Sequence, residues 1–380
     1  MDLASGAPIA MVRSMSEASV RLALSADGHI NEPGDLWSRN LPAAMVDAGP
    51  RVQVRDGKIA MVVEGRVIRR LAPAPESMKE GETANLGSWS ENDAPSRLEA
   101  LERDGVRGEV LYPTVTFFTA YSIEDRELQR AVCEVYNDWL AETFADPHFA
   151  AVAVLPAANP AGCVAELRRL EGKGVNAALL PAHSDDLPYN RDDWEPLWEA
   201  AAAMNVSLSF HAGSGRHQAP IRGAGGAVAN YVITCSGPIE TASVLCASGI
   251  LERHPKLRTV LVECGAGWLA WALDAMDDAY REHEMFVSPK LQELPSFYFR
   301  RQGGVTFQRD RVGIANRTLT GDDCLMWGSD YPHPEGTYPH SQEILTRDFE
   351  GVGQESIDAL TWKNAARLYG LALPEGFALD

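Results

Sequence analysis

The sequence is poor in cysteine, and the cysteines it has are scattered. Six cysteines occur in 380 residues, and none of them stands in a C-x-x-C pair. A disulfide-bonded scaffold would be short and rich in cysteine, so the sequence excludes that class of protein. We therefore expect buried, reduced thiols and a cytoplasmic location.

Long apolar runs and an excess of positive charge are also lacking. No apolar stretch approaches the ~20 residues that span a bilayer. With 34 Lys+Arg against 53 Asp+Glu, the formal net charge is −19, whereas nucleic acids and anionic membranes attract cationic proteins. The sequence therefore favours a small-molecule substrate and excludes a nucleic acid or a membrane as the main partner. Most of the acidic excess is interpreted as solvated surface.

Three common catalytic signatures are absent. The chain has no Walker phosphate loop and no dinucleotide-binding glycine fingerprint. The segment Gly213-Ser214-Gly215 lacks the G-x-S-x-G frame of a nucleophile elbow, which argues against a serine mechanism.

The sequence does contain a regular alternation of short apolar runs and amphipathic stretches. The apolar runs are at residues 22–26, 106–111, 151–155, 176–180, 206–210, 259–262, 304–307 and 324–327. Helical patterns lie between and after them, at 124–144, 160–171, 194–204, 237–254, 269–283 and 355–369. Eight strands that alternate with helices predict an α/β fold, a (β/α)₈ TIM barrel. A doubly wound open sheet would need a glycine-rich turn after the first strand, and SADGHINEP is not one.

One segment interrupts the alternation. Residues 51–70 alternate polar and apolar side chains, with Asp56-Gly57 and Glu64-Gly65 as turn signals, which predicts a small β-meander. A loop with Gly, Pro and Ser follows at 73–95. We place both in an insertion, residues 50–95, between the first and second barrel strands. Residues 21–380 are expected to form a single domain, preceded by a flexible arm at 1–20.

Side chains that can bind a metal follow four of the eight expected strands. These are Asp27 and His29 after the first strand, His211 after the fifth, Glu263 after the sixth and Asp330 after the eighth. The carboxyl ends of barrel strands meet at one mouth, where the chemistry of such barrels takes place. Two imidazoles and two carboxylates suit Zn²⁺, or Mn²⁺ if further oxygen ligands join. We predict one divalent metal ion, with Zn²⁺ preferred to Mn²⁺.

These residues lie in motifs that resemble a known family. The motifs are SADGHINEPGDLW at 25–37, LSFHAGSG at 208–215, RHPKLRTVLVECGAGWLAWALDAMD at 253–277, LMWGSDYPHPEG at 325–336 and NAARLYGL at 364–371. In combination they resemble the amidohydrolase superfamily, in particular the amidohydrolase-related branch that includes aminocarboxymuconate-semialdehyde decarboxylase and γ-resorcylate decarboxylase. The resemblance extends over residues 22–371.

The resemblance implies a metal-containing barrel. It places Asp27, His29, His211 and Asp330 at the metal-ligand positions of the family. Asp330 would also accept the proton of a metal-activated water, and we assign catalytic roles to Asp330, Glu263 and His211.

At the end of the sixth strand the sequence departs from the related decarboxylases. They carry a histidine proton donor there, where this chain has Glu263. A carboxyl group can replace it only if burial or a neighbouring charge raises its pKa. Glu263 could instead bind the metal or orient His211. Two interpretations of Glu32 remain, either a role at the metal or a role as a structural hydrogen-bond acceptor.

Four residues are candidates for substrate binding. His183 follows the fourth strand and either contacts the substrate or is a loop histidine. His333 follows Asp330 and either contacts the substrate or stabilises a turn. Phe117 follows the second strand and forms either a pocket wall or a packed helix start. Arg216 could hold a substrate carboxylate, or be an ordinary exposed arginine.

These observations favour a metal-dependent hydrolase of an amide or lactone bond. The alternative is a non-oxidative decarboxylase of an aromatic or unsaturated carboxylic acid, with a hydratase and a non-catalytic binding protein as further options. Because Glu263 replaces the histidine donor, we rank hydrolysis first. We also expect a homodimer or a higher homo-oligomer.

Overall fold

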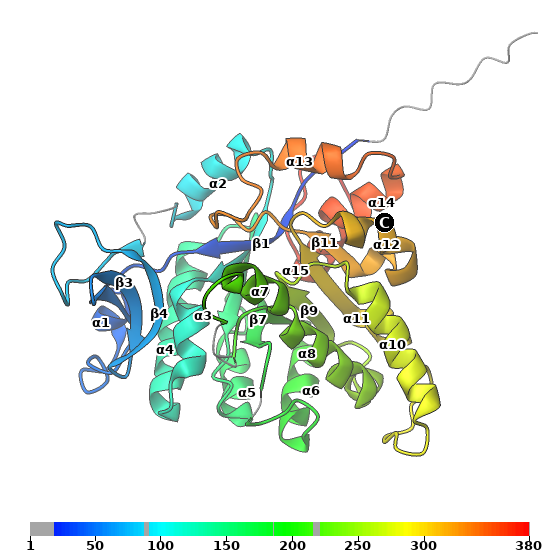
Figure 1. Ribbon diagram of the computed structural model, residues 1–380, viewed down its shortest axis with the longest axis horizontal. Coiled ribbons are helices and arrows are strands. Elements are labelled where there is room, and N and C mark those ends of the chain that lie inside the picture. Colours follow the sequence, from blue (N-terminus) through cyan, green and yellow to red (C-terminus); the bar gives the residue numbers. More distant parts are fainter. Residues whose placement is uncertain (1–18, 87–90, 185, 216–220, 380) are drawn as a thin grey trace, which may run out of the picture.

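The computed structural model describes residues 19–86, 91–184, 186–215 and 221–379, and its centre is a parallel eight-stranded barrel (Figure 1). The strands follow one another around the barrel in chain order. They are β1 (Ser25–Ile30), β5 (Glu109–Pro113), β6 (Phe149–Val154), β7 (Val175–Pro181), β8 (Ser207–His211), β9 (Arg258–Val262), β10 (Gly303–Phe307) and β11 (Leu325–Trp327). This arrangement confirms the predicted (β/α)₈ barrel.

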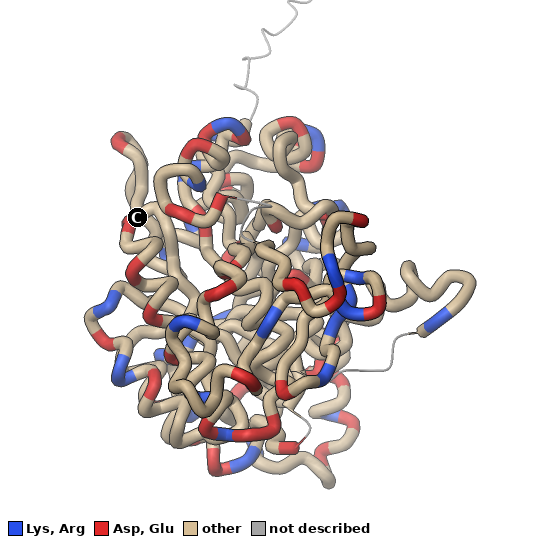
Figure 2. Tube along the Cα trace, turned by 90° about the vertical axis from the view of Figure 1, so that its left-hand side faces the viewer, with Lys and Arg blue, Asp and Glu red and all other residues tan. Residues whose placement is uncertain are grey.

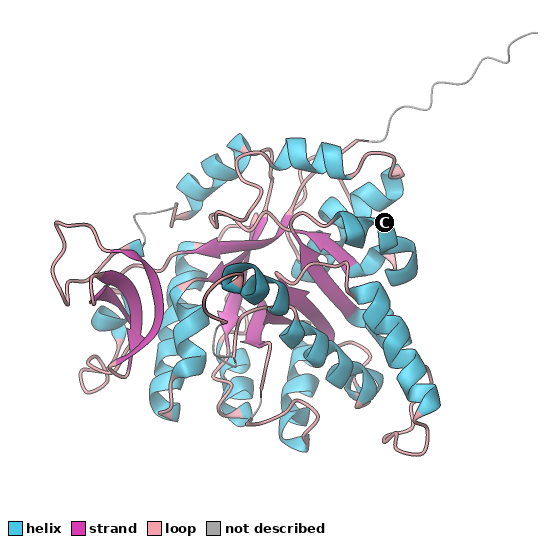
Figure 3. Cartoon of the chain, viewed as in Figure 1, coloured by secondary structure: helices cyan, strands magenta, loops and turns pink. Residues whose placement is uncertain are grey.

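Helices surround the strands, as Figure 3 shows in cyan around magenta. They are α1 (Leu36–Asn40), α2 (Ala94–Arg103), α3 (Val115–Thr119), α4 (Arg126–Thr143), α5 (Pro160–Arg169), α6 (Glu195–Met204), α7 (Gly226–Ile233), α8 (Ser236–Ala247), α9 (Ile250–Arg253), α10 (Leu269–Glu282), α11 (Pro295–Gln302), α12 (Arg311–Thr320), α13 (Ser341–Asp348), α14 (Gln354–Asp358) and α15 (Asn364–Tyr369). Among the described helices, none is both long enough and apolar enough to cross a membrane.

Two helices that the sequence predicts as continuous are divided. The pattern at 237–254 gives α8 and α9, because Gly249 between them takes a left-handed conformation with φ 77°. The pattern at 355–369 gives α14 and α15, joined by a π-helical segment at Ala359–Lys363.

The predicted insertion is present as a separate three-stranded antiparallel sheet. Its strands are β2 (Arg51–Arg55), β3 (Lys58–Val63) and β4 (Arg66–Pro73). Both hairpin turns have positive φ at two successive residues, Asp56-Gly57 and Glu64-Gly65, as type I′ turns require. The sheet lies at one side of the barrel (Figure 1), and a small apolar core that includes Met61 and Val132 joins it to α4.

The barrel closes between its first and last strands. Gly28 of β1 forms a bridge with Tyr331, just beyond β11. The amide of His29 donates to the carbonyl of Tyr331 at 2.7 Å, and the amide of Asp330 donates to the carbonyl of Asp27 at 2.8 Å. The closing seam therefore contains three of the predicted site residues in its backbone pairing.

The expected N-terminal arm falls almost wholly outside the described residues, which begin at Ser19. Charges of both signs are interspersed over the side of the molecule that Figure 2 presents. This distribution agrees with the interpretation of the acidic excess as ordinary surface.

Candidate active site

Five predicted residues converge at the mouth formed by the carboxyl ends of the strands. Asp27 and His29 lie within β1 rather than after it, so the first strand is later in the sequence than we expected. His211 is the last residue of β8. Glu263 follows β9, and Asp330 follows β11 by three residues.

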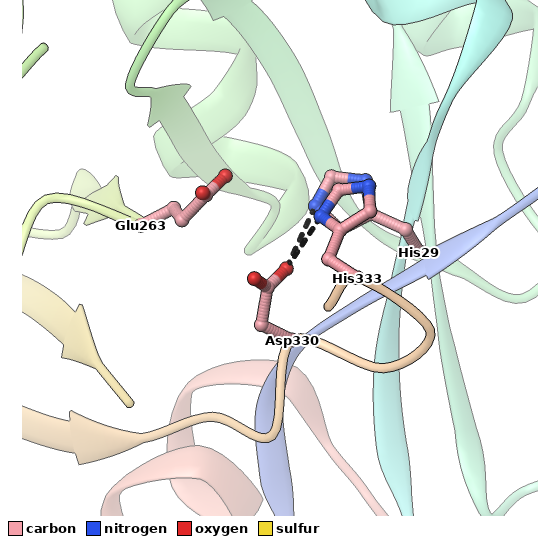
Figure 4. A group of neighbouring side chains, drawn as sticks. All are labelled: His29, Glu263, Asp330 and His333. Atoms are coloured by element: carbon pink, nitrogen blue, oxygen red, sulfur yellow. Dashed lines mark hydrogen bonds and ion pairs between the residues drawn. The ribbon is translucent and has the colours of Figure 1, made fainter. Parts of the chain in front are cut away.

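The ligating atoms of these side chains are close enough to share an ion. Asp27, His29 and His211 form one group in which the candidate ligand atoms lie within 4.8 Å of one another. His29 also belongs to a second such group with Glu263, Asp330 and His333 (Figure 4). Asp27, His29, His211 and Asp330 are all at least 98% buried.

The backbone turns sharply at the two strand-end carboxylates. Glu263 and Asp330 both adopt left-handed conformations, with φ 52° and 56°. A non-glycine residue in this region costs about 1–3 kcal/mol and is concentrated at functional sites. In Figure 4 the carboxylate of Asp330 lies beside the rings of His29 and His333, and the side chain of Glu263 extends toward them from the end of another strand.

The two buried imidazoles face each other through their Nε2 atoms. Nδ1 of His29 is 3.1 Å from the carbonyl of Pro113, and Nδ1 of His211 is 3.0 Å from the carbonyl of Ala212. A carbonyl can only accept, so each Nδ1 carries a proton, and in the neutral ring each Nε2 is then an acceptor. These Nε2 atoms are 3.1 Å apart. Neutral imidazoles in these tautomers cannot hydrogen-bond there, but a cation would satisfy both.

The carboxylates beside them also have unfilled acceptors. Within the described part of the chain, Oδ1 of Asp27 and Oδ2 of Asp330 are buried without a hydrogen-bond partner. Oδ1 of Asp27 is 3.7 Å from Nε2 of His29 and 3.6 Å from Nε2 of His211. Buried polar atoms are normally paired. Two nitrogen and two oxygen donors with unfilled lone pairs fit a divalent cation.

The pKa shifts reflect a crowded, buried and negatively charged site. Burial, then the charge of Asp330, raises the pKa of Glu263 to about 8. Burial raises the pKa of Asp330 to about 6, although its hydrogen bond with His333 opposes the shift. Burial lowers the pKa of His29 well below its usual value. For His211 burial also acts downward, but Asp27 outweighs it and the pKa is raised.

Two of the four substrate-binding candidates border this cluster. Nδ1 of His333 is 2.9 Å from Oδ1 of Asp330, and its ring centroid is 4.2 Å from that of His29. The ring of Phe117 packs edge-on against His211, with the centroids 4.7 Å apart. His183 instead pairs with Glu240 of α8, with 3.1 Å between Nδ1 and Oε2. Arg216 lies outside the described residues.

Glu32 has a structural environment. Its carboxylate accepts hydrogen bonds from the amides of Val115 and Thr116, both at 2.8 Å, and from the Thr116 hydroxyl at 2.7 Å. These contacts hold the start of α3, where unpaired amides face outward. The structure thus supports the hydrogen-bond acceptor interpretation of Glu32.

A buried ion pair behind the mouth had no signal in the sequence. Arg97 of α2 donates from Nε to Oε2 of Glu109 on β5 at 2.7 Å, and both side chains are fully buried. Nη2 of Arg97 also donates to the carbonyl of Tyr331 at 2.9 Å. Glu109 lies directly against Gly28, where a Cβ would approach its carboxylate to 2.1 Å. The pair therefore supports the backbone on both sides of the closing seam.

Further neighbours of the site come from distant segments. Thr306 of β10 accepts from the amide of Glu263 at 2.8 Å and lies 3.5 Å from Oδ2 of Asp27. Tyr112 of β5 packs against His211 with 5.1 Å between ring centroids. Arg69 of the insertion lies over the ring of Phe118 at 4.2 Å. Burial lowers the pKa of its guanidinium, and the charge of Glu263 opposes this shift. Only the packing of the insertion onto α3 could have placed Arg69 here.

The chain belongs to the amidohydrolase family, whose model matches residues 73–371. This confirms the resemblance seen in the sequence motifs. Decarboxylase orsB of Emericella nidulans is 32% identical over 120 residues, which are 30% of this chain and 34% of that protein. The chain therefore matches only about a third of that relative's length. Gamma-resorcylate decarboxylase of Rhizobium radiobacter is 25% identical over 258 residues, 62% of this chain and 76% of the relative.

Solved structures share the fold at lower identity. Amidohydrolase map2389c of Mycobacterium avium subsp. paratuberculosis K-10 has a TM-score of 0.74 at 18% identity, over 93% of this chain and 100% of the other. 5-Carboxyvanillate decarboxylase LigW of Sphingomonas paucimobilis has a TM-score of 0.68 at 21% identity, with the same coverage. A dihydroxybenzoic acid decarboxylase of Polaromonas sp. JS666, solved with manganese and 2-nitroresorcinol, has a TM-score of 0.64 at 18% identity, over 93% and 98%.

Proposed function

We propose that this enzyme of the amidohydrolase family is a metal-dependent, non-oxidative decarboxylase of a small aromatic carboxylic acid. The observation that carries the proposal is that four donor atoms without hydrogen-bond partners, from two histidines and two aspartates, converge beside a third acidic group, Glu263, at one barrel mouth. Two relatives that are named decarboxylases support this reaction. They favour it over hydrolysis, which we ranked first from the sequence.

The residues that would hold the metal are Asp27, His29, His211 and Asp330. A divalent cation held there supplies a Lewis acid that attracts the substrate carboxylate and a neighbouring oxygen. The carboxylates of Asp27 and Asp330 in this buried site also require a compensating positive charge. The manganese in a structural neighbour supports Mn²⁺ at this site, whereas the donor set favours Zn²⁺.

The protein's own residues would then manage one proton. The carbon–carbon bond to the carboxylate breaks, CO₂ leaves, and the bonding electrons remain on the ring carbon. The Glu263 carboxyl donates its proton to that carbon and is re-protonated from water, so the reaction consumes one proton in all. Asp330 is held in place by His333 at 2.9 Å.

Two further groups would position the substrate. The Phe117 ring, packed on His211, offers an apolar wall for an aromatic ring. Arg69 brings a guanidinium from the insertion toward the carboxylates, and can attract an anionic substrate to the mouth.

The test begins with metal-reconstituted protein and a panel of hydroxybenzoates, including 2,6-dihydroxybenzoate and 5-carboxyvanillate. The substrate's absorbance and the released CO₂ are followed together, in D₂O as well as in H₂O. We expect equimolar loss of carboxylate and release of CO₂, with one deuterium on the product ring. Matched amides and lactones are tested in H₂¹⁸O, because ¹⁸O in the product without CO₂ would establish hydrolysis instead.

Variants separate the site from the rest of the surface. Glu263→Gln should lower kcat by at least about 100-fold, the usual contribution of a positioned acid, while the metal content stays the same. The matched control is Glu343→Gln, whose side chain is 85% exposed on α13. If both variants were equally active on a substrate that the wild-type protein decarboxylates, Glu263 would be excluded as the proton donor.

A further inference from the structure

A cavity lies at the opposite end of the barrel from the candidate active site. Its volume is about 680 Å³. Its walls come from the first residues of β9 and β10 and from the ends of α6, α11 and α15. Since Arg258 begins β9 and Glu263 follows the end of that strand, the length of the strand separates the two sites.

The charge of this cavity is opposite to that of the chain. Five cationic side chains line it, and the only acidic side chain in its wall is Asp323. The cations are Lys256, Arg258, Arg300, Arg301 and Arg367. The chain as a whole has only 34 Lys+Arg against 53 Asp+Glu. A concentration of positive charge in so acidic a protein calls for a physical reason.

Ion pairing within the protein does not account for these cations. Arg367 is paired with Asp323 at 3.7 Å between Nη2 and Oδ1. Among the described residues, the other four have no carboxylate within 4.0 Å. Arg301 also lies over the rings of Phe297 and Tyr298, and its charge acts on Glu252 from a longer distance. Surface arginines elsewhere in this chain are commonly paired, as Arg130 is with Glu127 and Glu134.

Helix ends compensate part of the charge. Arg300 donates to the carbonyls of Leu319 and Thr320 at 2.9 and 3.2 Å, at the end of α12. Arg301 donates to the carbonyl of Leu251 at 2.6 Å, and Arg258 to that of Arg367 at 3.1 Å. Carbonyls near a helix end carry only partial negative charge, so the four cations without a carboxylate keep most of their positive charge.

The same contacts hold the guanidinium groups in place before any ligand arrives. An arginine fixed by carbonyls loses little side-chain entropy when it binds, and its planar fork suits phosphate oxygens. A cavity of this volume falls within the usual range for small-molecule sites. The cations are distributed over three segments of the wall, which suits separated anionic groups better than a single ion.

We infer that this cavity binds a small phosphorylated compound with two phosphate groups. This cavity is separate from the metal site. An experiment can therefore refute phosphate binding here without refuting the proposed decarboxylase activity, and the reverse. Binding should be salt-dependent, because the phosphates of the ligand neutralise cations that no carboxylate of the protein pairs.

The probe is fructose 1,6-bisphosphate, with fructose 6-phosphate and fructose as the mono-phosphorylated and uncharged comparisons. Isothermal titration of the full-length, metal-loaded protein at low ionic strength should show saturable binding of the bisphosphate. The affinity should be at least tenfold weaker for the monophosphate, and fructose should not bind. Absence of saturable bisphosphate binding at millimolar concentration overturns the proposal.

Two kinds of variant locate the binding. Lys256→Gln/Arg258→Gln removes two cations, and Ala203→Glu adds a carboxylate to the wall while it leaves every arginine contact intact. Both should weaken bisphosphate binding at least tenfold. The control is Arg281→Gln on α10, which removes an exposed arginine outside the cavity. A loss of affinity in the control equal to that in Ala203→Glu would refute the assignment, whereas an unchanged rate of decarboxylation is expected in all three variants.

Discussion

The buried pair of Arg97 and Glu109 gives the sharpest prediction about the stability of the site. Both side chains are fully buried and 2.7 Å apart. Replacing either partner leaves the other in a dry environment, but the two residues can respond differently. A carboxylate can take up a proton, whereas a guanidinium stays charged at every accessible pH.

In Arg97→Met the energetic cost is limited by protonation of Glu109. Starting from an ordinary pKa of 4.5, protonating a carboxylate at pH 7 costs about 3.4 kcal/mol, and at pH 5 about 0.7 kcal/mol. Burial already raises the pKa of Glu109, and removal of Arg97 raises it further. The variant is then most stable below the pKa that Glu109 has in the unfolded chain. It loses stability as the pH rises from there toward the higher pKa of Glu109 in the folded protein. The loss relative to wild type should therefore shrink by up to about 2.7 kcal/mol from pH 7 to pH 5.

In Glu109→Gln the remaining charge cannot be discharged. The expected loss is about 3–5 kcal/mol at both pH values. Urea unfolding of wild type and variants at pH 5 and pH 7 measures both effects. Arg130→Met, which removes an exposed and paired arginine, should cost less than about 1 kcal/mol. An equal loss for Arg97→Met at the two pH values would refute the protonation argument.

Three further predictions concern individual side chains. His211→Ala should abolish stoichiometric metal binding, measured by elemental analysis after dialysis, because it removes one of the two facing imidazoles; a full complement of metal would contradict the assignment. Glu32→Gln should lower stability in urea by about 1–3 kcal/mol through its lost charged hydrogen bonds, with unchanged metal content. Gly57→Ala places a Cβ at φ 70° and should cost about 1 kcal/mol without any change in activity, and a change in activity would show that the β2–β3 turn affects the site.

The sequence was sufficient for the barrel and for the residues at its mouth. Most of the strands are short and apolar. Glu263 directly follows one of them and His211 ends another, so the period of the pattern and these positions could be predicted together. The first strand was placed too early, because Leu22-Ala23-Leu24 is as apolar as a strand but lies before the pairing with β5. The meander at 51–70 was predictable because its turn residues are specific to type I′ hairpins.

Contacts between distant segments could not be predicted in this way. The pairing of Arg97 with Glu109 depends on how α2 packs on the barrel, and neither residue stands in a distinctive motif. Arg69 approaches the site only because the insertion folds back over α3. His183 follows a strand at the mouth as expected, yet it pairs with Glu240 because α8 begins beside it.

The closing seam of the barrel links the assembly of the fold to the loading of its metal. Ser25 and Ser329, which are 304 positions apart, bond to each other immediately beside Asp27 and Asp330. A chain that has not yet supplied β11 therefore has only part of the donor set. An ion bound across this seam would hold the first and last strands of the barrel together. At a free ion concentration a thousand times the dissociation constant, it would add about 4 kcal/mol to the stability of the closed barrel. Metal supply would then decide how much of the protein persists in the folded state as well as how much of it is active.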